Sequence, residues 1–265
     1  MYSTLHIERQ GRIATIWMNR PEVLNAFNED LIADLSAACK ELDADDSVRI
    51  VVLAGRGKHF SAGADLNWMK RASVQSPEEN VADARKFAGM LRTLSDLSKP
   101  TIARVQGAAL GGGTGLTAAC DMAIASDDAV FATSEVKFGI IPSAISPYVL
   151  RAIGPRQALR YFQSAERIPA ARALAIGLVN EVVPTAELDA RVAELAEALI
   201  VGGPLAQQAA KDLIRAVAGR PIDDAVSEET AQRIARQRAT DEAKDGIAAF
   251  LEKREPAWLS ASGGS

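Results

Sequence analysis

The sequence predicts an α/β protein in which pairs of short strands alternate with helices, followed by a helical C-terminal region. Two observations lead to this fold class. Through most of the chain, short apolar or alternating runs typical of strands precede helices of 3.6-residue periodicity. After about residue 200, only helical periodicity remains. The order strand, strand, helix differs from the regular strand–helix alternation of a Rossmann sheet.

The first third of the chain predicts two strands, a helix and a third strand. Residues 5–8 and 13–18 form the strand pair, and Asn19-Arg20-Pro21 ends the second strand. The helix begins after Asn28, a favourable N-cap residue. Residues 48–55 predict a buried strand, because branched apolar residues follow one another without alternation. The apolar residues of the helix share one face: Leu31, Ile32, Leu35, Ala38, Cys39 and Leu42.

The middle of the chain repeats this order. Residues 76–79, Ser-Pro-Glu-Glu, form a capping box that opens a helix ending before Lys99-Pro100. Residues 101–107 predict the next strand, and residues 121–126 and 129–133 predict two more after a glycine-rich stretch. The helix opened by the capping box is expected to bury one face: Val81, Ala84, Phe87, Leu91 and Leu94.

From about Pro142 the pattern becomes helical, with one late strand in residues 177–183. The expected core domain comprises residues 1–200. Residues 201–259 form a helical region that is too small to bury a separate core well, so it packs on the body or on another subunit. Residues 260–265 are small and polar and are expected to be a disordered tail.

The composition favours a cytoplasmic globular protein. The chain is 48% hydrophobic and 24% charged, and its net charge of −4 provides no basic field for nucleic acid. No apolar run approaches the roughly 20 residues of a membrane helix, and the N-terminus lacks the features of a signal peptide. Cys39 and Cys120 show no metal or redox spacing and are expected to be buried thiols.

The stretch GAALGGGTGLTAACD, residues 107–121, has three possible explanations. It nearly fits a phosphate-binding loop, but Gly113 stands where the lysine must be. It nearly fits a dinucleotide fingerprint, but Leu116 stands where the last glycine must be. The third explanation is an oxyanion site, in which glycines let backbone N–H groups at a helix start approach a ligand. From the residues alone, a glycine turn needed only for packing is equally open.

A second loop, GKHFSAGADL at residues 57–66, also follows a buried strand and precedes an expected helix, which Asp65 caps. Two such loops can supply two N–H donors that converge on one carbonyl oxygen. The histidines do not form a nucleophile–base pair, because His59 lies too close to Ser61 along the chain. We expect His59 and His6 to be structural or exposed, and no cluster has metal-ligand spacing.

Several motifs together resemble the crotonase superfamily, also called the enoyl-CoA hydratase/isomerase family. HFSAGADL and VQGAALGGGTGLTAACD are joined, in the same order and spacing, by NRPEVLNAF, ATSEVKFGIIP and LAIGLVNEVV. The resemblance covers roughly residues 5–255. It implies a crotonase-like ββα spiral with a C-terminal helical trimerisation region, in a homotrimer or a dimer of trimers (hexamer). It also implies an acyl-CoA thioester substrate and no separate cofactor, since coenzyme A belongs to the substrate.

The resemblance implies the site residues. The backbone N–H groups of Ala64 and Gly112 match the two oxyanion donors of the family. Ala62, Asp65 and Leu66, and more weakly Val23, match positions that contact the coenzyme. The C-terminal end, with Phe250 and Lys253, matches a segment that reaches a neighbouring subunit's coenzyme. For this last segment, a solvated end of an amphipathic helix is an equally open reading.

Hydratases of this family commonly use two glutamates, and only one is present here. The position of the first is Gly115, whereas the second matches Glu135. Apolar neighbours favour burial of Glu135, which raises a carboxyl pKa and suits proton transfer near neutral pH. Ser143, Ser146 or a backbone group are candidates to hold the water that a second carboxylate holds elsewhere.

The stretches HFSAGADLNWM and GIIPSAISPYVLRAIG are most similar to bacterial methylglutaconyl-CoA and isohexenylglutaconyl-CoA hydratases of leucine and acyclic terpene degradation. The resemblance therefore implies a lyase of fatty acid or leucine metabolism that adds water reversibly, with syn geometry, to a 2-enoyl-CoA. An enoyl-CoA isomerase with a single glutamate is the alternative enzyme. A non-catalytic acyl-CoA-binding protein is the alternative outside enzymes.

Overall fold

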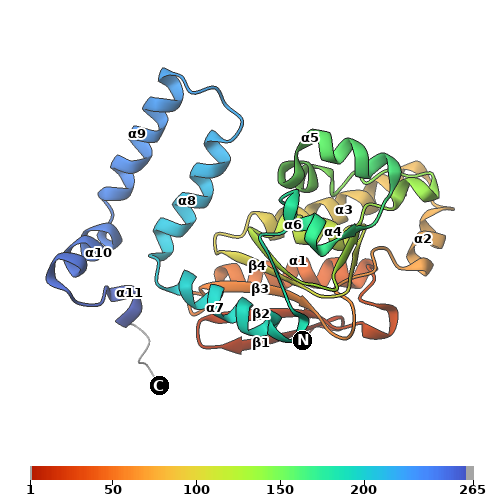
Figure 1. Cartoon of the computed structure of the whole chain (residues 1–265), viewed down its shortest axis with the longest axis horizontal. Coiled ribbons are helices and arrows are strands. Elements are labelled where there is room, and N and C mark those ends of the chain that lie inside the picture. Colours follow the sequence, from red (N-terminus) through yellow and green to blue (C-terminus); the bar gives the residue numbers. More distant parts are fainter. Residues whose placement is uncertain (1, 261–265) are drawn as a thin grey trace. The chain divides into compact units, whose positions relative to one another are not determined.

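A computed structural model describes residues 2–260 of the chain (Figure 1). The chain divides into two compact units. The first unit comprises Met1–Leu97 and Thr101–Ala196, and the second comprises Ser98–Pro100 and Glu197–Ser265. Of the expected tail, Ser260 closes the last helix, and residues 261–265 lie outside the described part.

The first unit is built on two sheets, in which parallel pairs predominate. The larger sheet has the order β1-β2-β3-β4-β6-β9, in which β1 and β2 pair antiparallel and the other described pairs are parallel. Its strands are β1 Leu5–Gln10, β2 Ile13–Met18, β3 Ile50–Gly55, β4 Thr101–Val105, β6 Met122–Ser126 and β9 Glu181–Val183. The smaller sheet has the order β5-β7-β8, with strands β5 Ala108–Leu110, β7 Val130–Ala132 and β8 Ile168–Pro169.

Helices α1, α3, α4 and α5 contact one another in this order, and α1 and α4 also lie against the larger sheet (Figure 1). Helix α1 contacts β1, β2 and α3, and α4 contacts β4 and β6. The helices are α1 Glu29–Ala44, α2 Leu66–Ala72, α3 Pro77–Ser95, α4 Gly112–Ala119, α5 Ser146–Ser164, α6 Ala170–Ala175 and α7 Leu188–Ile200, whose last turn belongs to the second unit. Residues 2–260 also include the short 3-10 helices η1 Pro21–Val23, η2 Glu135–Phe138 and η3 Thr185–Glu187.

The mixed α/β class and most elements are confirmed. The Asn28 side chain accepts a hydrogen bond from the Leu31 amide, as a helix N-cap should (2.9 Å). The residues buried by α1 are the six that the periodicity predicts. The capping box formed by Ser76 and Glu79 is also present. Helix α5 is kinked at Gly154, whose φ of +73° breaks the helix where Gly-Pro punctuates the sequence.

Helix α3 differs from its prediction in its first half. Leu91 and Leu94 are buried with Met90, but Val81 and Ala84 are exposed and Phe87 is only partly buried. An apolar face predicted by periodicity is buried only where a partner element lies against it. The start of α3 therefore presents apolar side chains that the described chain leaves uncovered.

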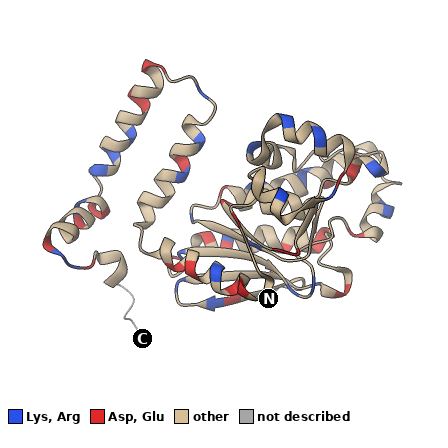
Figure 2. Cartoon of the chain, in the orientation of Figure 1, with Lys and Arg blue, Asp and Glu red and all other residues tan. Residues whose placement is uncertain are grey.

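The second unit is helical, with α8 Pro204–Val217, α9 Asp224–Arg238, α10 Asp241–Glu252 and α11 Ala257–Ser260. The Glu242 carboxylate joins α10 to α8 by accepting hydrogen bonds from the amides of Leu205 (2.9 Å) and Ala206 (2.8 Å). Acidic residues gather at the start of α9 and basic residues at its end, which complements the helix dipole (Figure 2). Within residues 2–260, no helix is long and apolar enough to cross a membrane.

Candidate active site

Two loops run side by side where β3 and β5 end. The Ser61 amide donates a hydrogen bond to the Ala108 carbonyl oxygen (3.0 Å), and the Leu110 amide donates one to the Ser61 carbonyl oxygen (2.9 Å). These bonds make Ser61 and Ala109 partners in a parallel bridge. The backbone after Ser61 therefore advances beside the backbone after Ala109, residue by residue.

Two glycines meet at the next contact between these loops. A Cβ atom on Gly63 would lie 2.9 Å from the Leu110 carbonyl oxygen, and one on Gly111 would lie 3.9 Å from the Gly63 Cα. Both glycines have a positive φ, +92° and +50°, which side-chain-bearing residues rarely adopt. Glycine is needed here because the two backbones approach closely. Ala64 and Gly112 follow directly on this contact.

Phe27 fixes the direction of the Ala64 N–H group. The Phe27 amide donates to the Gly63 carbonyl oxygen (2.7 Å), and the Asp65 amide donates to the Phe27 carbonyl oxygen (2.8 Å). In a trans peptide the C=O and N–H groups point in opposite directions. Because the Gly63 carbonyl faces Phe27, the Ala64 N–H faces away from it. Among the described residues this N–H has no acceptor.

The Gly112 N–H group is fixed by the start of α4. Gly112 is the first residue of this helix, and the Gly111 carbonyl accepts from the Gly115 amide (3.1 Å). The Gly112 N–H of the same peptide therefore points out of the helix N-terminus, where the helix dipole favours negative charge. Like the Ala64 N–H, it donates to no oxygen of residues 2–260. The site thus offers two unused donors from adjacent loops.

Glu135 lies beside the second of these donors. The Gly111 amide donates to the Ala132 carbonyl oxygen at the end of β7 (2.8 Å), which ties the segment leading to Glu135 to this loop. A Cβ on Gly111 would lie 3.2 Å from Glu135 Oε1. The other carboxylate oxygen, Oε2, is buried and has no hydrogen-bond partner in the described part of the chain. The Glu135 carboxylate therefore lies beside Gly111, the residue that precedes the Gly112 donor.

The surroundings of Glu135 favour its protonated form. Burial raises the pKa of Glu135 above its ordinary value of 4.5, and a hydrogen bond from its own backbone only partly opposes this effect. A carboxyl with a raised pKa is a stronger base when ionised. It suits a residue that takes and returns a proton near neutral pH.

The raised pKa predicts a pH-dependent gain in stability for Glu135→Gln. The unfolded chain loses this proton near 4.5, and the folded chain loses it only at higher pH. The free energy of unfolding of the wild type therefore falls as pH rises from the unfolded-state pKa through the folded-state pKa. Glutamine has no such dependence. We expect the variant to melt at a higher temperature than the wild type at about pH 8 and at the same temperature at about pH 4. An equal difference at both values would contradict the argument.

The position that lacks the family's first glutamate is filled from another element. A Cβ on Gly115 would lie only 2.2 Å from Ile145 Cγ2 and 2.7 Å from Ile145 Cβ. Ile145, which precedes α5, is 1% exposed. The space where a glutamate side chain would begin is thus occupied by a methyl group of Ile145, and Gly115 packs against this apolar side chain. Sequence reasoning identified Gly115 but gave no signal for Ile145.

The two serines predicted as anchors for water lie in the turn before α5. The Ser146 hydroxyl donates to the Ser143 carbonyl oxygen (2.7 Å), so its proton is used within this turn. The Ser143 side chain is exposed. Their role in holding water stays a prediction.

The residues predicted to contact coenzyme A fall into two groups. In the first unit, the Ala62 N–H donates to the Leu24 carbonyl oxygen (2.9 Å), which brings η1 with Val23 next to this loop. Leu66 is 81% exposed at the start of α2. Phe250 and Lys253 lie in the second unit, where both are exposed. Their contact with coenzyme stays a prediction.

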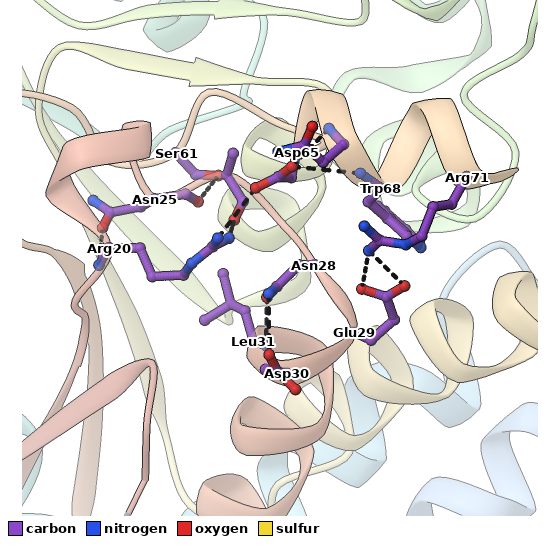
Figure 3. Close-up of polar contacts among 12 residues, drawn as sticks. Arg20, Asn25, Asn28, Glu29, Asp30, Leu31, Ser61, Asp65, Trp68 and Arg71 are labelled. Atoms are coloured by element: carbon purple, nitrogen blue, oxygen red, sulfur yellow. Dashed lines mark hydrogen bonds and ion pairs between the residues drawn. The ribbon is translucent and has the colours of Figure 1, made fainter.

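Asp65 has partners inside the protein. Its carboxylate caps α2 by accepting from the amides of Asn67 (2.8 Å) and Trp68 (3.4 Å), and it pairs with Arg20 (3.1 Å; Figure 3). Burial alone raises the pKa of Asp65, but these hydrogen bonds outweigh it and hold the pKa below its ordinary value. The carboxylate is therefore charged and engaged, and Arg20 is a residue that sequence reasoning missed.

The histidines are structural or exposed, as predicted. His59 Nδ1 accepts from the Ala108 amide (2.9 Å), so this ring joins the first loop to β5. His6 is exposed in β1 and lies 3.5 Å from Glu8. Neither contacts Glu135 through a hydrogen bond or ion pair in the described residues.

Comparison with known proteins shows the family to which the chain belongs. A sequence model of the family described as Enoyl-CoA hydratase/isomerase matches residues 8–261. A crystal structure from Legionella pneumophila, described as an enoyl-CoA hydratase/isomerase (crotonase), is 43% identical with a TM-score of 0.92 and covers 97% of this chain and 99% of its own. An enoyl-CoA hydratase from Shewanella pealeana is 39% identical with a TM-score of 0.94, at 96% coverage of both chains.

A curated relative is the short-chain-enoyl-CoA hydratase of Clostridium acetobutylicum, which is 36% identical over 94% of this chain and 95% of its own length. The family match, the fold and the relatives agree over almost the whole chain. The protein therefore belongs to the enoyl-CoA hydratase/isomerase family.

Proposed function

We propose that this protein is an enoyl-CoA hydratase, a lyase that adds water reversibly to a 2-enoyl-CoA thioester. The single observation that carries the proposal is the buried, unpartnered Oε2 atom of the Glu135 carboxylate, in a side chain that lies beside the loops of two unused backbone donors. Relatives named short-chain-enoyl-CoA hydratase and crotonyl-CoA hydratase, at 36% and 35% identity, support the same reaction. No cofactor is needed beyond the coenzyme A of the substrate.

In this mechanism the thioester oxygen accepts hydrogen bonds from the amides of Ala64 and Gly112. These donors stabilise the negative charge that moves onto this oxygen when the β-carbon is attacked. The ionised Glu135 carboxylate takes one proton from water while the water oxygen bonds to the β-carbon and an enolate forms. The same carboxyl then returns the proton to the α-carbon. The product is a 3-hydroxyacyl-CoA, and one carboxyl acting on one face gives syn addition.

The lone carboxylate also orients the water. Oε2 of Glu135 has no partner in the described residues, so it can accept a hydrogen bond from the attacking water. The apolar Ile145 fills the place of the second carboxylate and offers no hydrogen bond there. Hydration can proceed without the second carboxylate, but Glu135 must then both take the proton from water and deliver the proton to the α-carbon.

For the finer assignment we propose a 3-methylglutaconyl-CoA-like substrate, on the similarity of the sequence around residues 59–69 and 139–154. We also propose a homotrimer or a dimer of trimers. Exposed apolar residues of the helical second unit support an interface between subunits: Leu205, Ile214, Ile247, Phe250 and Leu251. A cytoplasmic location, and the lack of nucleic-acid or membrane partners, stay predictions from composition.

Enoyl-CoA isomerisation is the second candidate function. It is favoured by one observation, the replacement of the second carboxylate by Ile145. A single carboxylate can move a proton from the α-carbon to the γ-carbon without water, and an apolar wall suits that reaction.

Product mass spectrometry in deuterated water distinguishes these functions. Crotonyl-CoA, 3-methylglutaconyl-CoA and 3-hexenoyl-CoA are incubated separately with the enzyme. Hydration of a 2-enoyl-CoA adds one molecule of heavy water and leaves a deuteron on the α-carbon, and we expect this product from the first two substrates. A double-bond shift in 3-hexenoyl-CoA without addition would support the isomerase instead. Tight binding of all three thioesters without conversion would identify a non-catalytic binding protein and overturn the proposal.

A further inference from the structure

The Arg20 side chain joins two segments that meet at the first oxyanion loop. Its Nη2 atom lies 3.1 Å from Asp65 Oδ2, and its Nη1 atom donates to the Ala26 carbonyl oxygen. The side chains of Arg20 and Asp65 are only 16% and 11% exposed. Figure 3 shows the guanidinium reaching across from the segment before α1 to the segment before α2. A mostly buried ion pair of this kind is costly to break from one side, because the remaining charge loses its partner.

The two groups that Arg20 holds flank the backbone bridge of Ala64. Ala26 precedes Phe27, whose amide and carbonyl bond to the residues on either side of Ala64. Asp65 follows Ala64. The guanidinium thus connects the two bridged segments, with one hydrogen bond to Ala26 beside Phe27 and one to Asp65 beside Ala64. The planar fork of arginine can serve both acceptors at once, whereas a lysine ammonium has no such fixed geometry.

Further hydrogen bonds make the segment that carries Arg20 rigid. The Asn25 side-chain oxygen accepts from the Arg20 amide (2.9 Å), and the Asn25 amide group donates to the carbonyl oxygens of Arg56 and His59 (2.9 Å each). The Ser61 hydroxyl donates to the Asn25 carbonyl oxygen (2.8 Å). Asn25 is completely buried. Arg20 therefore binds Asp65 to the rigid segment around Asn25, and these bonds restrain Ala64, the residue before Asp65.

We propose that Arg20 is a positioning residue, which orients the Ala64 N–H toward the thioester oxygen by holding Asp65 and Ala26. This inference rests on the proposed function. It predicts that loss of Arg20 impairs the transition state, where the oxygen is most negative, more than it impairs binding of the thioester.

A second ion pair, made by α2, the helix that Asp65 caps, provides a matched control. Arg71 of α2 pairs with both oxygens of Glu29 at the start of α1 (2.8 and 2.7 Å; Figure 3). These side chains are 54% and 40% exposed, and they attach α2 without touching the Ala64 bridge. If any ion pair on α2 matters equally, Arg71→Ala will behave like Arg20→Ala.

The test compares Arg20→Ala, Asp65→Asn, the double variant, Arg20→Lys and Arg71→Ala with crotonyl-CoA as substrate. We expect kcat to fall about 10- to 100-fold in both single variants, with KM changed less than about threefold. The double variant should lose little more than Arg20→Ala alone, because each single variant already removes the contact between Arg20 and Asp65. Arg20→Lys should regain part of kcat, and Arg71→Ala should keep it. If Arg20→Ala does not fold, Asp65→Asn and Arg20→Lys provide the same comparison.

Acetoacetyl-CoA separates failure of this inference from failure of the proposed function. This β-keto thioester ionises to an enolate that absorbs in the near ultraviolet, and its binding requires no hydration. We expect Arg20→Ala and Asp65→Asn to bind it with a similar dissociation constant by calorimetry but to show a weaker enolate band. Lack of turnover of both crotonyl-CoA and 3-methylglutaconyl-CoA by the wild type would overturn the proposed function and leave this readout intact. Variants that keep kcat and the enolate absorbance and lose only thermal stability would overturn the positioning role. A fold-loss of kcat in the double variant equal to the product of the two single fold-losses would also overturn it.

Discussion

Glu135→Gln is expected to lower kcat for hydration of crotonyl-CoA by about 10³-fold or more, while the dissociation constant of the thioester changes less than about threefold. Glutamine keeps the size of the side chain but can neither accept the proton of water nor return one to the α-carbon. The loss should be at the upper end for a general acid–base residue, because Gly115 and Ile145 provide no second carboxyl.

Glu187→Gln is the matched control for this substitution. Glu187 lies in η3 and is exposed, so its variant should keep full activity. Steady-state kinetics give kcat. Calorimetry with butyryl-CoA, a saturated thioester that cannot be hydrated, gives the dissociation constant. More than about a tenth of wild-type activity in Glu135→Gln would refute the assignment of this residue, since no such rate remains when the only proton-transfer group is removed.

Gly115→Glu is expected to lower the free energy of unfolding by about 3 kcal/mol or more. The first atom of the new side chain would fall 2.2 Å from Cγ2 of the buried Ile145, so one of them must move. Overpacking alone costs about 1–3 kcal/mol, and a carboxylate without a partner adds to it. The glutamate common in the family is thus incompatible with this chain unless Ile145 also changes.

The double variant Gly115→Glu with Ile145→Ala tests that explanation. It should regain part of the stability lost in Gly115→Glu, although Ile145→Ala alone leaves a cavity costing about 2–5 kcal/mol. Gly89→Glu is the control, because a Cβ at this position in α3 meets nothing within 4 Å. Urea denaturation gives all four free energies. Strictly additive losses at 115 and 145 would show that the contact between them is not what excludes glutamate.

Much of the fold could be predicted from local patterns. The α1 face, the two helix caps and the kink at Gly154 depend on residues within a few positions of one another, so spacing alone reveals them. Strand β5 was missed, because its three residues between Gly107 and Gly111 are too few to show a period. The shortened burial of α3 could not be predicted either, since it depends on which elements reach the helix.

The residues of the candidate site also divide into those that local sequence motifs predict and those that depend on contacts between distant segments. The two glycine loops and Glu135 were found through motifs that are continuous in sequence. The contacts of Arg20 with Asp65 and of Gly115 with Ile145 join residues far apart in the chain, and they exist only once the loops are folded. Arg20 looked like part of a strand-ending Asn-Arg-Pro, and nothing in its neighbours pointed to a carboxylate 45 residues away.

The most direct measurement of the central claim is a crystal structure of the Glu135→Gln variant with crotonyl-CoA bound. We predict that the thioester oxygen lies about 2.7–3.1 Å from the backbone nitrogens of both Ala64 and Gly112, with the side-chain amide of residue 135 facing the double bond. A thioester oxygen that contacts neither nitrogen, or a residue 135 turned away from the acyl chain, would contradict it.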